Sequence, residues 1–178
     1  YGVGYEGKTA DKLTLINDDA SIGDLLSLVF GTADLFMAPG CRVYLAAPPG
    51  PLNLVFRQAF MAAGWRFHEG LVWVKNSMVL GHSDYHLKHE DIFYGWKPGE
   101  GRVGRGDHDG SRWYGDNAQT SVFEVDRPSR SEEHPTMKPP VLVVAHLRNS
   151  SRPGDCILDP FLGSGTTIVA AEQLRRIS

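Results

Sequence analysis

The chain has 178 residues, of which 42% are apolar and 22% charged, and its formal net charge at pH 7 is −3. This length and apolar content exclude a disordered protein and predict one domain with a sizeable core. No apolar run approaches the roughly 18 residues of a membrane span, so no membrane partner is expected. Two cysteines, Cys41 and Cys156, are too few for a disulfide scaffold, and we expect both to be reduced and buried in a cytoplasmic protein.

The first half of the chain predicts two helices on either side of a strand. Apolar residues recur at helical spacing over 22–37 and again over 51–63. The short apolar run 41–47, followed by Pro48-Pro49-Gly50, predicts a buried strand. This order is typical of an α/β sheet with helical crossovers.

The second half predicts more strands, a long loop and two further helices. Strands are expected at 71–74, 92–96 and 120–125, and the glycine-rich segment 97–119 is expected to be a loop. A helix over 139–149, a strand over 156–158, a tight loop over 159–165 and a helix over 166–176 complete the chain.

The loop between the last strand and the last helix carries the strongest chemical signal. It reads Asp-Pro-Phe-Leu-Gly-Ser-Gly-Thr-Thr over 159–167, and its glycines allow a ligand to approach backbone N–H groups at the helix N-terminus. It lacks the lysine of a phosphate-binding P-loop, and Ile168 occupies the third glycine position of a dinucleotide fingerprint. Asp159 suits a cationic or amine-bearing ligand better than a pyrophosphate. A glycine-rich turn without a ligand is the remaining alternative.

Residues 159–167 resemble the S-adenosyl-L-methionine (AdoMet) binding motif D-P-F-x-G-S-G-T-T of the amino-DNA methyltransferases, which methylate adenine or cytosine amino groups in DNA. His-Pro-Thr-Met-Lys-Pro at 134–139 resembles the family's H-P-T-x-K-P segment, and 71–76 and 83–97 resemble its phage and prophage branch. An AdoMet loop placed after the catalytic half is the order of the β group.

The resemblance implies an α/β, Rossmann-like AdoMet-dependent methyltransferase fold, with a mostly parallel sheet that includes an antiparallel hairpin. It implies one domain over 1–178, with target recognition held within 76–130. The implied cofactor-binding residues form the loop and a segment at the methionine end of AdoMet: Asp159, Pro160, Phe161, Gly163, Ser164, Gly165 and Thr166, with His134, Thr136 and Lys138.

The family's catalytic signature is D-P-P-Y or S-P-P-Y, and Tyr1 resembles its tyrosine. Because the preceding Asp-Pro-Pro is absent, and 175–178 lie where the family enters its next strand, we expect a fragment truncated at both ends. The amine of a base is a poor nucleophile, so hydrogen-bond acceptors must make its nitrogen more tetrahedral before it attacks the methyl group. The base must first leave the duplex, and Tyr1 is the candidate face on which it stacks.

The resemblance implies AdoMet-dependent methylation of DNA within a restriction-modification setting, with adenine preferred because of the likeness around 2–19. The alternatives are cytosine-N4 methylation, methylation of RNA or a small amine, and a non-catalytic remnant that binds AdoMet or DNA. The expected partner is double-stranded DNA with a flipped base, and a homodimer is left open.

The candidate phosphate contacts are five basic residues, each of which is alternatively a solvated surface charge: Lys75, Lys88, Arg102, Arg105 and Arg112. The region 66–112 is close to charge balance, so any basic face must arise from folding. No metal is expected, because His82, His86 and His89 with Glu90 lack the defined scaffold of a zinc site.

Overall fold

The computed structural model describes residues 22–80, 84–99, 112–127 and 137–178. Several predictions concern residues outside these ranges, and they stay predictions: those for Tyr1, His82, Arg102, Arg105, His134 and Thr136. The likeness around 2–19, on which the adenine preference depends, also lies outside the described residues.

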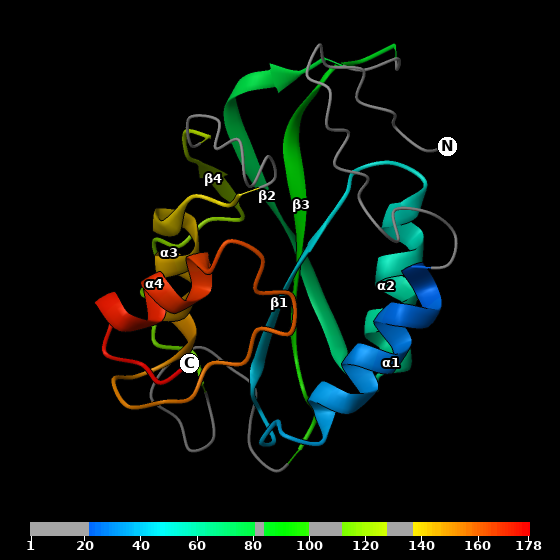
Figure 1. Cartoon of the computed structure of the whole chain (residues 1–178). Coiled ribbons are helices and arrows are strands. Elements are labelled where there is room, and N and C mark those ends of the chain that lie inside the picture. Colours follow the sequence, from blue (N-terminus) through cyan, green and yellow to red (C-terminus); the bar gives the residue numbers. More distant parts are fainter. Residues whose placement is uncertain (1–21, 81–83, 100–111, 128–136) are drawn as a thin grey trace.

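A four-stranded sheet forms the centre of the described chain (Figure 1). Its strands are β1 (Arg42–Ala47), β2 (Arg66–Val79), β3 (Leu87–Trp96) and β4 (Val122–Glu124), in the order β1-β3-β2-β4. The predicted antiparallel hairpin is confirmed as the β2–β3 pair. The predicted mostly parallel character is not seen in the described residues, because β3 lies antiparallel between β1 and β2 and only β2–β4 pair in parallel.

Four helices accompany the sheet, close to the predicted positions: α1 (Ile22–Asp34), α2 (Leu52–Ala62), α3 (Pro140–Ser150) and α4 (Thr166–Gln173). Their ends follow local signals. Gly64, in a left-handed conformation with φ of 82°, follows α2, and a proline opens α3 where its missing N–H costs no helical hydrogen bond. Figure 1 shows α1 and α2 together on one side of the sheet and α3 and α4 on the other.

Alternation along β3 divides the core between the two faces of the sheet. Phe93 points toward α1 and α2, where it joins a cluster that includes Phe30 and Phe60. Its neighbour Tyr94 points to the opposite face and packs in a second cluster with Trp73. Leu142 of α3 belongs to this second cluster, so α3 covers the face that α1 and α2 leave free.

The chain after α3 departs from two expectations. The predicted strand at 156–158 is reduced to an isolated parallel bridge between Cys156 and Ile177. Both cysteines are free thiols, but Cys156 is exposed and Cys41 half-buried, so the prediction that both are buried is wrong. Cys156 lies at a bridge that no further strand covers within the described residues. No helix in this described part is long and apolar enough to cross a membrane.

Candidate functional site

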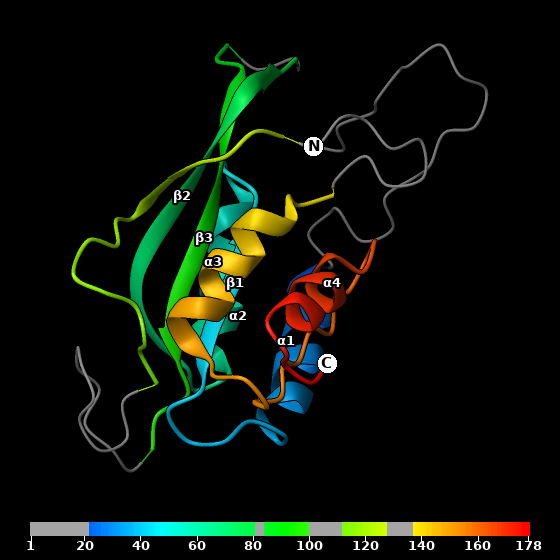
Figure 2. The same cartoon turned by 90° about the vertical axis from the view of Figure 1, so that its left-hand side faces the viewer.

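The loop over 159–165 leads from the Cys156 bridge into α4 (Figure 2). The side chain of Asp159 connects the loop to the first turn of α4. One carboxylate oxygen, Oδ1, accepts a hydrogen bond from the backbone N–H of Phe161 at 2.9 Å. The other, Oδ2, accepts one from the hydroxyl of Thr167 at 2.5 Å. Two carboxylate oxygens offer about four acceptor positions, so Asp159 can fix the loop and still accept a hydrogen bond from a ligand.

The two loop glycines leave the backbone open. Gly163 and Gly165 have φ values of 52° and 79°, in the left-handed region that residues with a Cβ rarely adopt. A Cβ built on Gly165 would meet no heavy atom within 4 Å, and one on Gly163 would meet only the Phe161 carbonyl oxygen, at 3.8 Å. Because Gly165 is the N-cap of α4, the free N–H groups of the first turn lie beside this open space.

Phe161 gives the loop an aromatic surface. Its ring meets Phe30 of α1 edge-on, with ring centroids 6.4 Å apart and planes at 89°. The residue is nevertheless 46% exposed. The contact fixes the ring against the core while leaving apolar surface for a planar ligand.

Hydrogen bonds connect the start of α4 to the segment before α3. The Thr166 hydroxyl donates to the backbone oxygen of Lys138 at 3.3 Å and lies 3.1 Å from the hydroxyl of Ser164. Thr166 is buried, whereas Ser164 is half-buried. The structure therefore places the backbone of Lys138 beside the start of α4.

An ion-pair network, in which Lys75 is buried and Glu90 is half-buried, holds the half-buried Lys138 side chain. Its Nζ lies 2.7 Å from one oxygen of Glu90, and the Nζ of Lys75 lies 2.7 Å from the other. Both ammonium groups lie beside the ring of Trp73, at 5.2 Å for Lys75 and 6.0 Å for Lys138. Burial alone would raise the pKa of Glu90, but its two lysine partners outweigh burial and lower that pKa below its ordinary value.

Three of the predicted DNA contacts lie in the described residues, and they differ in their exposure to solvent. Lys75 is only 7% exposed and is paired with Glu90, so its ammonium group faces the interior. Lys88 is exposed near the start of β3, and Arg112 is half-buried. Sequence reasoning missed the role of Glu90 as the partner of two lysines, since the contact joins three separate segments. No pattern within one segment could have revealed it.

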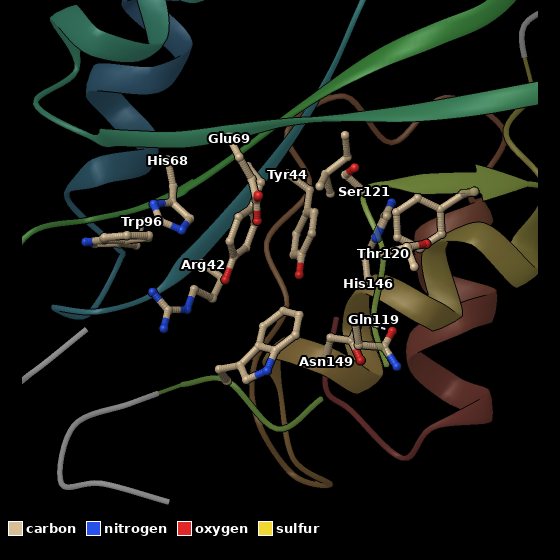
Figure 3. A pocket seen from close by; sticks show the side chains of 14 residues that line it. Arg42, Tyr44, His68, Glu69, Trp96, Gln119, Thr120, Ser121, His146 and Asn149 are labelled. Atoms are coloured by element: carbon tan, nitrogen blue, oxygen red, sulfur yellow. Dashed lines mark hydrogen bonds between the residues drawn. The ribbon is translucent and has the colours of Figure 1, made fainter. Parts of the chain in front are cut away.

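The structure also contains a cavity that the sequence did not predict. About 430 Å³ in volume, it lies on the sheet face covered by α3 and is lined by residues of β1, β2, β3 and α3 and by the segment 113–123 (Figure 3). Figure 3 shows Arg42 and Tyr44 of β1 and His146 of α3 around this space. None of these three belongs to a motif recognisable in the sequence.

Comparison with known proteins gives a consistent result. The model of a family described as DNA methylase matches residues 15–178. Type II methyltransferase M.BglI of Bacillus subtilis is 27% identical over 137 residues, covering 73% of this chain and 37% of that protein. Type II methyltransferase M.XycI of Xanthomonas campestris pv. cyanopsidis is 29% identical over 142 residues, covering 72% and 45%. The chain thus spans less than half the length of these two relatives.

Solved structures resemble the fold. The M1.HpyAVI–SAM complex has a TM-score of 0.65 at 19% identity, covering 84% of this chain and 72% of that one. TTHA0409 of Thermus thermophilus, complexed with S-adenosyl-L-methionine, also scores 0.65 at 19%, covering 89% and 70%. The cytosine-N4-specific PvuII DNA methyltransferase scores 0.61 at 15%, covering 85% and 64%. These likenesses confirm the Rossmann-like methyltransferase fold that the sequence predicts.

Proposed function

Because this chain belongs to the DNA methylase family, we propose that it binds AdoMet at the loop 159–165 and transfers a methyl group to the exocyclic amine of adenine in DNA. The match over 15–178 supports a methyltransferase acting on DNA amino groups. We propose adenine as the target base. The competing target is the N4 amine of cytosine, because the PvuII enzyme of the same fold is cytosine-N4-specific.

The observation that carries the proposal is the open, pre-formed loop before α4. Asp159 fixes its backbone, while Gly163 and Gly165 leave free space beside the N–H groups of the helix. AdoMet is an amine-bearing, cationic ligand with a flat adenine ring and a carboxylate. An acidic side chain, an exposed aromatic ring and helix N–H donors match these groups, so the residues present fit the cofactor.

Bound AdoMet supplies an electrophilic methyl group on a positively charged sulfur. Asp159 would accept a hydrogen bond from the ligand, and Phe161 would pack against its flat ring. Lys138, whose ammonium is held by Glu90, would face the methionine end together with His134 and Thr136. Tyr1 would stack the flipped target base, an interaction worth roughly 1–3 kcal/mol per base.

Basic residues that are exposed or half-buried are proposed to contact the DNA backbone. Lys88 and Arg112 carry this part of the proposal among the described residues, with Arg102 and Arg105 beyond them. Lys75 is left out because its charge is paired with Glu90 inside the protein. Within 76–130, we place target recognition in the segments that connect the strands, since β3 and β4 belong to the central sheet.

Radiolabelled AdoMet incubated with the full chain and unmethylated duplex DNA tests this function. We expect label in N6-methyladenine after digestion of the DNA. Label confined to N4-methylcytosine would overturn the adenine preference, and label transferred to RNA or free nucleosides in parallel reactions would overturn DNA as the substrate. AdoMet binding without transfer to any acceptor would favour the non-catalytic alternative.

A further inference from the structure

The cavity under α3 is separate from the loop 159–165, with which it shares no lining residue. Its volume of about 430 Å³ falls within the range of roughly 300–1,000 Å³ that is usual for small-molecule sites. The segment 113–119, which forms one wall of the cavity, is held against α3 by two hydrogen bonds. The N–H of Tyr114 donates to the backbone oxygen of Asn149 at 2.8 Å, and the Asn149 side chain donates to Gln119 at 2.9 Å. A Cβ on Gly115 would come within 2.7 Å of Asn149 Oδ1, so this wall fits closely against α3.

Two side chains in this cavity carry buried polar atoms without partners. Neither ring nitrogen of His146 has a hydrogen-bond partner among the described residues, although the residue is only 7% exposed. The same holds for the Nε and one terminal nitrogen of Arg42. Leaving such groups unpaired costs free energy, so native proteins rarely do so without a reason. A ligand that accepts hydrogen bonds from Arg42 and forms one with His146 would remove part of this cost.

Aromatic rings form much of the remaining wall. Tyr44 stacks on His146 with ring centroids 4.4 Å apart, and Tyr94 lies 5.0 Å from Tyr44. Trp113 is 6.1 Å from Tyr94, and the Arg42 guanidinium lies 4.9 Å from the centre of the Trp96 ring. These surfaces favour a flat, unsaturated ligand, because aromatic rings pair with one another in stacked or edge-on arrangements.

We propose that this cavity binds a planar aromatic molecule that carries one anionic group. Arg42 pairs with the anion, since a guanidinium presents parallel N–H donors that match a carboxylate or phosphate. His146 bonds a neutral polar group of the ligand, because burial lowers its pKa to about 4 and keeps the ring uncharged at neutral pH. Glu69 also lines the cavity, but it is exposed, so solvent screens its charge and weakens its repulsion of the anionic group.

A nucleoside monophosphate and an aromatic carboxylate share this chemistry, and calorimetry on the full chain distinguishes them. The probes are adenosine 5′-monophosphate and indole-3-acetate, each beside its neutral counterpart, adenosine and indole-3-acetamide. We expect one anionic probe to bind with one-to-one stoichiometry and about tenfold more tightly than its neutral counterpart, as a charge-assisted hydrogen bond provides. The anionic probe that binds shows whether the cavity takes a nucleoside monophosphate or an aromatic carboxylate.

Variants assign the binding to the cavity. Arg42→Met should lower the affinity of the anionic probe about tenfold, to that of the neutral one. Arg66→Met is the matched control, because Arg66 faces the same Trp96 ring from 5.6 Å but does not line the cavity, and it should leave the affinity unchanged. If Arg42→Met does not fold, His146→Phe should weaken the same probe. Gly163→Val should leave probe binding intact.

Three results would overturn the proposal. The first is a folded chain that binds neither anionic probe at millimolar concentration. The second is an equal loss of affinity in Arg42→Met and Arg66→Met. The third is loss of probe binding in Gly163→Val, which would place the probe in the loop before α4 instead of the cavity.

Discussion

Gly163 has a left-handed backbone, with φ of 52°, and faces the open space in front of the loop. Both features disfavour a larger side chain at this position. Gly163→Val strains the backbone and fills space that a ligand would occupy. We expect the affinity for S-adenosylhomocysteine, measured by calorimetry, to fall at least about tenfold, the equivalent of roughly 1.4 kcal/mol.

Gly154→Val separates strain from occupancy of the site. Gly154 has a φ of 87° and equally open surroundings, but it lies outside the loop. Its valine variant should lose stability much as Gly163→Val does, while binding S-adenosylhomocysteine with unchanged affinity. Equal binding losses in the two variants would contradict the placement of the cofactor at this loop.

His146 makes stability depend on pH in a defined window. Burial lowers its pKa from 6.5 to about 4, so between these values the unfolded chain binds a proton that the folded chain does not. The free energy of unfolding should therefore fall as the pH falls from 6.5 toward 4, by on the order of 3 kcal/mol in total. Urea titrations across this range measure the loss.

His146→Phe provides the comparison, since it keeps a ring beside Tyr44 and Phe123 but does not titrate. As the pH is lowered, the parent chain should lose stability relative to the variant. Glu90, whose lowered pKa makes its contribution disappear only in more acidic solution, affects both proteins equally. Parallel pH curves for the two proteins would show that His146 is not buried in its neutral form.

Glu90 joins three parts of the fold. It lies on β3, pairs with Lys75 on β2, and pairs with Lys138 in the segment that enters α3. Glu90→Gln leaves the Lys75 ammonium buried without an opposite charge, which we expect to lower the free energy of unfolding by about 3 kcal/mol. Urea denaturation at neutral pH measures the change.

Lys75→Met should lower the free energy of unfolding by clearly less than Glu90→Gln does. It removes the most deeply buried of the three charges and leaves Glu90 paired with Lys138. Combining the two substitutions should restore part of the loss seen for Glu90→Gln alone, as expected for residues in direct contact. A Glu90→Gln effect no larger than that of Lys75→Met would mean that the network does not depend on the carboxylate.

Elements with local signals are predictable from this sequence, and pairings between distant segments are not. The proline that opens α3 and the glycine that follows α2 are read directly from the sequence. The position of β3 between β1 and β2 depends on contacts between residues far apart in the chain, so local sequence patterns do not reveal that it is antiparallel to both neighbours. The loop 159–165 is recognisable because its residues are contiguous, whereas Arg42 and His146 meet only after folding.

With a net charge of −3, the chain would depend on a few exposed basic side chains, and not on bulk attraction, for the proposed binding to DNA. Lys88 is one of these, exposed at the β2–β3 hairpin. If it contacts a phosphate, Lys88→Ala should weaken binding similarly for all DNA sequences and reduce the slope of log affinity against log salt by about 0.9.

Fluorescence anisotropy with labelled duplex DNA over a range of salt concentrations measures this slope. Arg148→Ala is the control, because Arg148 is also exposed but lies in the last turn of α3, on an element outside the hairpin. Its slope should equal that of the parent chain. Unchanged slopes in both variants would remove Lys88 from the DNA-binding surface, because a phosphate contact releases counterions whatever the sequence of the DNA.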